Sequence, residues 1–354
     1  MTLRRFPTLS ATLGLALLLL AARPVHAQVA LQLFGDIDYV YARNPVGPPT
    51  STFAIPTFDV FASGAQDRFT YLAELVFEAN ESNKFEADLE RIELGYLFSN
   101  WLRVKVGRFH SAIGYYNDAY HHGAYYELTA GRPILVHFED RGGLLPSHTI
   151  GLHADGRFVL GAVGDLRYDL EVTNGRGATL GELANFADAQ RSKAVNLRLR
   201  FSPAALDGLS LGVNGIYDRF SFTPEGGETR RFDELIVGAH ATYLADRIHF
   251  IAEAALVTHV PVDDAGPTLR SLGAFAEVGY AFGDVEPYAR YERVAYADEG
   301  DPLYAGAPGS FHAVLAGAKW TVSGNVALKA QLQRTFFDAG PASWRATAQA
   351  SYGF

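Results

Sequence analysis

Much of the chain alternates apolar and polar residues with a period of two. Between Leu166 and Thr173, for example, Leu, Tyr, Leu and Val alternate with Arg, Asp, Glu and Thr. The same alternation recurs in 69–78, 102–106, 195–201 and 248–256. A period of two places successive side chains on opposite faces of a β-strand, whereas an amphipathic helix repeats its apolar positions every three to four residues. The pattern therefore predicts an all-β fold whose strands have one apolar and one polar face.

Breaks in the alternation divide the pattern into about sixteen strands. They are predicted to start near Ala30, Thr52, Arg68, Asp88, Trp101, His148, Asp165, Lys193, Leu209, Phe232, Arg247, Arg270, Val285, Phe311, Asn325 and Ser343. Many reach about ten residues, the length that a tilted strand needs to cross a bilayer, whereas strands of globular proteins average about five or six. A transmembrane β-barrel is therefore favoured over a soluble β-sandwich.

The predicted connections alternate in length. Those after odd-numbered strands are long, such as Asn174 to Ser192 and the region from His110 to Pro146, and those after even-numbered strands are tight, such as Ser99-Asn100 and Ala245-Asp246. Short periplasmic turns and long extracellular loops are typical of antiparallel outer-membrane barrels. Closure of such a sheet removes its exposed edges.

The two ends of the chain support export to the outer membrane. Arg4 and Arg5 precede an apolar run from Leu13 to Ala22, and small residues at Val25 and Ala27 mark a cleavage site, so residues 1–27 are predicted to be a cleavable signal peptide and 28–354 the barrel. The run is shorter than the roughly 20 apolar residues of a membrane-spanning helix. The last strand ends on Tyr352 and Phe354, which is similar to the aromatic signal that the barrel-assembly machinery reads.

Composition narrows the class of partner. Removal of Arg4, Arg5 and Arg23 with the signal peptide leaves 27 of the 30 basic residues against 39 acidic ones, so the net charge falls from −9 to about −12. Nucleic acid is excluded as a partner because it requires a basic surface. The chain contains no cysteine, so the fold needs no disulfide.

Several short segments resemble the bacterial outer-membrane porin superfamily, and especially its phosphate-selective group. They are 104–109 (VKVGRF), 172–175 (VTNG), 193–201 (KAVNLRLRF) and 286–292 (EPYARYE), and their order along the chain carries the resemblance. The resemblance implies passive diffusion of small hydrophilic solutes or ions through a water-filled barrel in the cell outer membrane. It also implies contact with outer-membrane lipid and lipopolysaccharide and a possible homotrimer.

The charges that the alternation places in the lumen do not support phosphate selectivity. Anion selection needs a basic path, but the predicted lumen positions mix both signs. The basic ones are Arg103, Lys105, Arg167, Arg198, Arg200, Arg290, Lys319, Lys329 and Arg345, and the acidic ones are Glu74, Glu78, Asp169, Glu171, Glu253 and Glu277.

The region from Gly107 to Pro146 is the richest in chemistry, and loops of this length are usually functional. In porins, the third loop folds into the lumen and narrows it, and this region occupies the matching place. The predicted pore-lining or constriction residues are Arg103, Lys105, Arg108, His110, His121, His122, Arg132, His137, Glu139, Asp140, Arg198 and Arg200.

Alternative roles for this region have less support. Adjacent histidines such as His121 and His122 rarely face one ion, so no metal site is expected. Ser147-His148 and the nearby acids form no recognised nucleophile motif, which weighs against a barrel hydrolase. A receptor would carry a separate plug domain, and none is expected before the first strand. The sequence therefore predicts a non-enzymatic channel without a cofactor.

Overall fold

The computed structural model of the chain describes most of the predicted barrel. The described residues are 28–44, 46–79, 84–120, 123–137, 143–176, 192–223, 228–263, 266–297, 301–304, 307 and 309–354. The predicted signal peptide, residues 1–27, lies outside them, as do four of the predicted constriction residues, His121, His122, Glu139 and Asp140.

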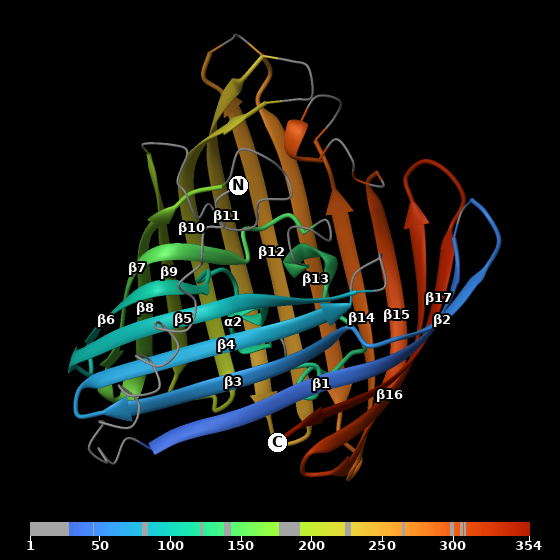
Figure 1. Cartoon of the computed structure of the whole chain (residues 1–354), viewed down its shortest axis with the longest axis horizontal. Coiled ribbons are helices and arrows are strands. Elements are labelled where there is room, and N and C mark those ends of the chain that lie inside the picture. The colour runs from blue at the N-terminus through green and yellow to red at the C-terminus, as the bar shows by residue number, and fades with distance from the viewer. Residues whose placement is uncertain are drawn as a thin grey trace, which may run out of the picture.

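The described residues form seventeen antiparallel strands in one sheet (Figure 1). Their bounds are β1 (Gln28–Arg43), β2 (Thr50–Ala54), β3 (Thr57–Gln66), β4 (Phe69–Ala79), β5 (Phe85–Ser99), β6 (Leu102–His110), β7 (His148–Val159), β8 (Gly164–Asn174), β9 (Lys193–Pro203), β10 (Leu209–Phe222), β11 (Arg230–Ala245), β12 (Ile248–Pro261), β13 (Leu269–Tyr280), β14 (Val285–Ala295), β15 (Phe311–Ser323), β16 (Val326–Phe337) and β17 (Ser343–Gly353). β2 and β3 act as one strand of the barrel, because both pair with β1 and only Ile55 and Pro56 separate them. Proline has no N–H to donate to a ladder, which explains the interruption. The barrel thus has sixteen strands, as the sequence predicts.

The first strand and the last strand pair with each other and close the sheet into a barrel. β1 pairs with β17 on one side, from Phe34 with Gly353 to Arg43 with Trp344, and with β2 and β3 on the other. Each remaining strand pairs with its neighbour in the chain. The backbones of Leu33 and Phe354 exchange two hydrogen bonds of 2.9 Å, so both ends of the barrel domain lie on the side of the tight turns. Closure satisfies the backbone groups that an open sheet would leave at its edges.

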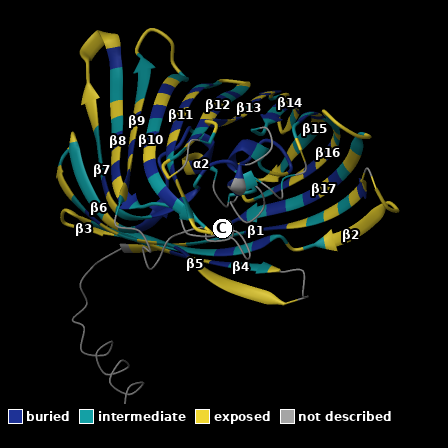
Figure 2. Ribbon diagram, turned by 90° about the horizontal axis from the view of Figure 1, so that it is seen from above, coloured by how far each residue is buried: buried dark blue, intermediate teal, exposed yellow. Residues whose placement is uncertain are grey.

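The side-chain alternation has the predicted direction. On β12, Ile251, Glu253 and Ala255 are buried in the interior, whereas Ala254 and Leu256 are exposed on the outer face. Figure 2 shows the resulting bands of buried and exposed residues along the strands. The exposed outer positions are mainly apolar, as contact with lipid requires.

A β-bulge on β5 departs from this alternation. Glu74 of β4 lies opposite Arg91, and the next residue, Leu75, lies opposite Leu89, so Glu90 is an extra residue in the ladder. Leu89 is exposed on the outer face, whereas Glu90 is buried and the side chain of Arg91 is only 17% exposed. A bulge re-aims a side chain in this way. Two consecutive charged side chains therefore point inward, which simple alternation does not predict.

The helices are short and lie in the connections. They are α2 (Tyr116–Ala119) and the 3₁₀ helices η1 (Ile134–Val136), η3 (Gly161–Val163) and η4 (Pro302–Tyr304). Among the described residues, none of these helices is long and apolar enough to cross a membrane.

Candidate functional site: the lumen and its internal loop

The described residues of the connection between β6 and β7 (111–120, 123–137 and 143–147) lie inside the barrel, and we call them the lumen loop. β6 extends to His110, so the loop begins at Ser111, one residue after the start of the predicted connection at His110, and residues 107–110 of the chemically rich region belong to the strand. Figure 2 shows its helix α2 within the ring of strands. Apolar loop residues pack in a buried cluster against the walls formed by β10 to β15. The loop contributes Ile113, Tyr116, Leu135, Val136, Leu144 and Leu145 to it.

Carboxylate and amide groups of the wall satisfy the backbone of the first part of the loop. Glu253 Oε1 accepts hydrogen bonds from the N–H groups of Tyr115 (2.9 Å) and Tyr116 (2.6 Å). Glu171 accepts one from the N–H of Ala112 at 2.9 Å, and Asn214 accepts one from the N–H of Gly114 at 3.3 Å. Buried backbone groups need such partners, so these inward polar side chains hold the loop in place.

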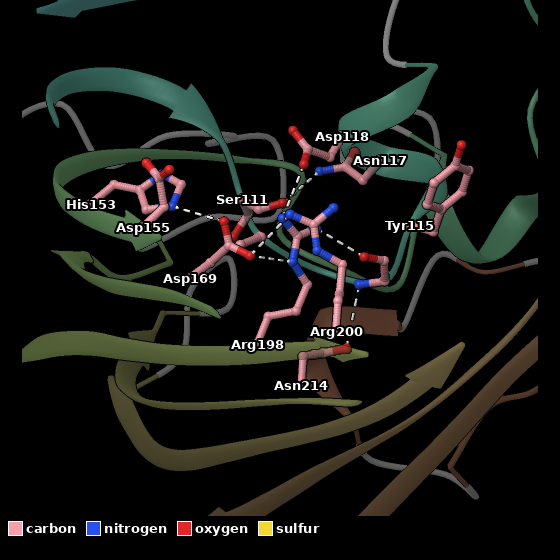
Figure 3. A network of polar contacts seen from close by, with 12 residues as sticks. Ser111, Tyr115, Asn117, Asp118, His153, Asp155, Asp169, Arg198, Arg200 and Asn214 are labelled. Atoms are coloured by element: carbon pink, nitrogen blue, oxygen red, sulfur yellow. Dashed lines mark hydrogen bonds and ion pairs between the residues drawn. The ribbon is translucent and has the colours of Figure 1, made fainter. Parts of the chain in front are cut away.

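Arg198 connects the wall to α2 (Figure 3). Its guanidinium donates to Asp169 of β8, to Asp118 of α2 and to the carbonyl oxygen of Gly114, each at 2.9 Å. The Arg198 side chain is only 1% exposed, and His153 and Arg200 also contact Asp169. Arg198 is therefore neutralised on both sides and positions the loop.

The second part of the loop is held by three further wall residues. Arg290 donates to Thr129 Oγ1 at 2.6 Å and to the carbonyl oxygen of Gly131 at 3.0 Å. Lys329 donates to the carbonyl oxygens of Ala124 and Thr129. Gln331 both donates to and accepts from the backbone of Ala130.

The loop reaches the opposite end of the barrel from its two attachment points. The phenol of Tyr125 donates to the carbonyl oxygen of Gly324 at 2.8 Å, and Gly324 lies in the tight turn between β15 and β16. Lys319, on β15, donates to the carbonyl oxygen of Tyr125 at 2.6 Å. The described part of the loop therefore extends from the wall at β6 and β7 to the tight-turn end of the lumen.

Charged residues line three of the larger cavities that border the lumen loop or the wall facing it. One of about 730 Å³ near the tight turns is lined by Glu93, Arg103 and Lys105 among others. A second of about 210 Å³ also borders Arg103 and Lys105 and is further lined by Asp118, Asp155, Arg157, Arg167, Asp169 and Arg200. A third of about 220 Å³ is lined by Asp36, Asp38, Glu127, Arg132, His137 and Arg345. Both signs of charge face each of these spaces.

The structure divides the predicted constriction residues into three groups. Arg103, Lys105, Arg200 and His137 border cavities. Arg198 and Arg132 are engaged with the loop itself; Arg132 borders the third cavity and also donates to the carbonyl oxygens of Val136 and Tyr120. Arg108 and His110 lie in a separate buried cluster around Glu90 and Glu74.

The alternation of the sequence does not mark Asn214, Gln331 or Glu90 as residues of this site. Glu171, Glu253 and Lys329 were predicted to face the lumen, but not to hold the loop. The sequence shows only that each of these residues is polar and lies at an inward position. That pattern does not reveal whether the side chain contacts solute, water or a loop.

The surroundings shift the pKa values of several loop groups. Burial acts to raise the pKa of Asp118, but Arg198 and Arg200 outweigh burial and hold it below its usual range. Burial raises the pKa of Glu127, although Lys329, Arg132 and Arg290 oppose the shift. Burial also raises the pKa of the Tyr116 phenol well above its usual value. Asp118 is thus held as a carboxylate, whereas the charged form of Glu127 is disfavoured.

Solved structures with the same architecture are outer-membrane porins. Outer-membrane expressed OmpT of Vibrio cholerae is similar with a TM-score of 0.62 at 12% identity, covering 94% of this chain and 99% of that one. The chain has the fold of a porin. The outer membrane channel DcaP of Acinetobacter baumannii has a TM-score of 0.59 at 14% identity over 94% and 99% of the two chains. OmpF of Salmonella typhi, solved in complex with daunomycin, has a TM-score of 0.58 at 15% identity over 93% and 98%.

The likeness to these porins lies in the structure, because the sequence identities are only 12–15%. No protein-family model matches the chain, and no curated protein matches its sequence. The porin architecture is therefore recognised from the three-dimensional arrangement and not from residue identity.

Proposed function

We propose that the protein is an outer-membrane porin through which small hydrophilic solutes or ions diffuse passively. The observation that carries the proposal is the lumen loop, which lies inside a closed sixteen-strand barrel and leaves charged cavities beside it. A barrel of this size encloses an aqueous channel unless it is plugged. The loop narrows that channel without requiring any catalytic group.

The constriction is formed where α2 and the loop face the wall. We assign its basic side to Arg103, Lys105 and Arg200, which border the cavity that Asp118 also lines. The cavity around Asp36, Asp38 and Glu127 supplies a side lined by carboxyl groups, together with Arg132 and His137. His121, His122, Glu139 and Asp140 remain candidates from the sequence alone.

This mixed distribution of charge favours weak ion selectivity. The finer resemblance to phosphate-selective porins would require a predominantly basic path. Asp118, Asp155 and Asp169 instead accompany the basic residues of the second cavity. We therefore propose a general diffusion channel and treat phosphate as one solute among several.

The targeting and assembly of the protein follow from the same proposal. Cleavage between Ala27 and Gln28 would release the barrel domain for insertion into the outer membrane. OmpT of Vibrio cholerae has been solved in a trimer form, and we propose a homotrimer here, surrounded by lipid and lipopolysaccharide. N-terminal sequencing of protein extracted from outer membranes tests the cleavage, and a mature chain that retains residues 13–22 would refute it.

Single-channel recording in a planar lipid bilayer tests the proposed function. Step-like conductance is expected from the intact barrel, and deletion of residues 116–134 should raise the conductance because it removes α2 and the segment of the loop that Arg290, Lys329 and Gln331 hold in the lumen. The deletion variant must first show heat-modifiable migration on SDS gels, the sign of a folded barrel. A folded intact protein without conductance would refute the channel, and hydrolytic turnover without conductance would favour a barrel enzyme.

A further inference from the structure

Three potential metal ligands meet on the inner wall at the base of the lumen loop. They are Glu90 on β5, His110 on β6 and His148 on β7, and one ligand atom from each lies within 4.8 Å of those from the other two. All three residues are buried, with relative exposures of 4%, 5% and 4% respectively. They come from three strands that are neighbours in the sheet.

The register of the sheet and the bulge together produce this cluster. His110 and His148 are direct partners in the β6–β7 ladder, and their ring centroids are 5.7 Å apart. Glu90 is the extra residue of the β5 bulge, and its Oε1 contacts the Nε2 of His148. Bulges commonly re-aim side chains next to functional sites.

We propose that Glu90, His110 and His148 bind a divalent transition-metal ion, of which Zn²⁺ is the best match. Two imidazole nitrogens and one carboxylate oxygen form a ligand set that suits zinc and leaves a fourth position for water. Ligand atoms around tetrahedral zinc are separated by about 3.3 Å when each bond is about 2.0 Å. The present separations are close enough for small side-chain rotations to reach that geometry.

The surrounding charges are compatible with an ion at this position. Arg108 contacts Glu90 through Oε2, at 3.5 Å, whereas the other oxygen, Oε1, is directed at His148. Glu74 lies 3.9 Å from the Nε2 of His110 and is itself paired with Arg91. Glu74 is therefore placed to orient His110 or to supply a fourth ligand, as carboxylates beside metal-bound histidines do.

A small space beside one of the three ligands, His148, is large enough for a water molecule. His148, together with Ser111, Thr149 and Glu171, lines a small cavity of about 20 Å³. A space of roughly 10–15 Å³ or more is needed to hold one water molecule.

The position of the cluster indicates what the ion would do. His110 is the last residue of β6 and His148 is the first residue of β7, so the two histidines flank the lumen loop directly. An ion shared by both would fasten the two ends of the loop to each other and, through Glu90, to β5. Because the ion binds only the folded barrel, it should raise the unfolding temperature in a concentration-dependent way.

Cobalt spectroscopy on the folded barrel tests the proposal. Residues 28–354, prepared without a polyhistidine tag and stripped with a chelator, are titrated with Co²⁺ in detergent while visible absorption is recorded. We expect intense tetrahedral d–d absorption that saturates at one Co²⁺ per chain and is displaced by Zn²⁺. Absence of saturable absorption in a folded sample would overturn the proposal.

Variants assign the ligands. His110→Ala, His148→Ala and Glu90→Gln should each weaken Co²⁺ binding by roughly tenfold or more, whereas His240→Ala, which removes another buried inward histidine, should leave it unchanged. Glu90→Gln preserves the volume of the side chain. It therefore still tests the proposed metal site if a histidine variant fails to fold. Equal binding by the folded Glu90→Gln and wild-type proteins would exclude Glu90 as a ligand and overturn the proposed three-residue site. Channel conductance is recorded on the same samples, so failure of metal binding is distinguishable from failure of the proposed porin function.

Discussion

The guanidinium of Arg198 on β9 lies 2.9 Å from the carboxylate of Asp118 on α2, and this contact joins the barrel wall to the loop inside it. The same guanidinium contacts Asp169 at 2.9 Å. The sequence predicts Arg198 as a pore-lining or constriction residue. Its position between two carboxylates shows that it holds the lumen loop, so its removal should affect stability before selectivity.

Replacement of Arg198 by methionine should destabilise the barrel. The change keeps much of the side-chain volume but leaves the buried Asp169 without its main cation, and loss of one partner of a buried ion pair costs about 3–5 kcal/mol. Urea or thermal unfolding in detergent measures the loss, and open-channel noise should rise as α2 loses its contact. Arg167→Met is the matched control, because Arg167 borders the cavity that Asp118 and Asp169 also line but is itself exposed. Equal effects of the two substitutions would contradict the positioning role of Arg198.

The stabilising contribution of Asp118 to the free energy of unfolding should be lost only in acid. Its folded-state pKa is lowered because Arg198 and Arg200 outweigh burial. A lowered pKa gives stability that is fully present above the unfolded-state value of about 3.9 and is lost as pH falls through the folded-state value. Thermal unfolding between about pH 2 and about pH 7 should show this loss below about pH 4, and Asp118→Asn should flatten it. An acid profile that is the same with and without the Asp118 carboxyl would rule out this linkage.

Substitutions on the two faces of β17 should lower the free energy of unfolding by different amounts. Ala348 is exposed on the outer face, whereas Gln349 is buried and donates to Asp36 at 3.2 Å. Ala348→Arg should cost about 2–4 kcal/mol if the site faces the middle of the bilayer, whereas Gln349→Arg places its charge beside a carboxylate and should cost much less. Folding titrations into lipid vesicles measure both values. Similar costs for the two variants would mean that the outer face of this strand does not meet lipid.

Loss of the terminal aromatic residue should impair insertion. Phe354 is 63% exposed and its ring lies 5.8 Å from that of the half-buried Tyr352, so the Phe354 side chain remains accessible just beyond the end of β17. Phe354→Asp should reduce the amount of heat-modifiable barrel in the outer membrane, because a charge replaces the expected recognition element. Phe354→Tyr, which keeps the aromatic ring, serves as the control. Wild-type levels of folded Phe354→Asp protein would show that assembly does not depend on this residue.

The sequence alone determined the strands and the direction of their side chains. Alternation such as Leu166 to Thr173 is a local property, because each residue's face depends only on its position in its own strand. The number of strands and the alternation of long and tight connections were equally local, since they follow from turn residues and segment lengths. For these reasons the sixteen-strand barrel could be predicted without knowing any contact between distant residues.

The tertiary structure alone decided the path of the lumen loop and the partners of the inward charges. Glu253 accepts from Tyr116, which lies 137 residues away in the sequence, and nothing in the alternation distinguishes an acid that binds a loop from one that faces solute. The Glu90 bulge likewise depends on pairing between β4 and β5, and it alone brings Glu90 to His148. The partner of each inward polar side chain depends on which buried groups lie close enough in three dimensions to form a hydrogen bond with it. The alternation of residues along the chain does not contain that information.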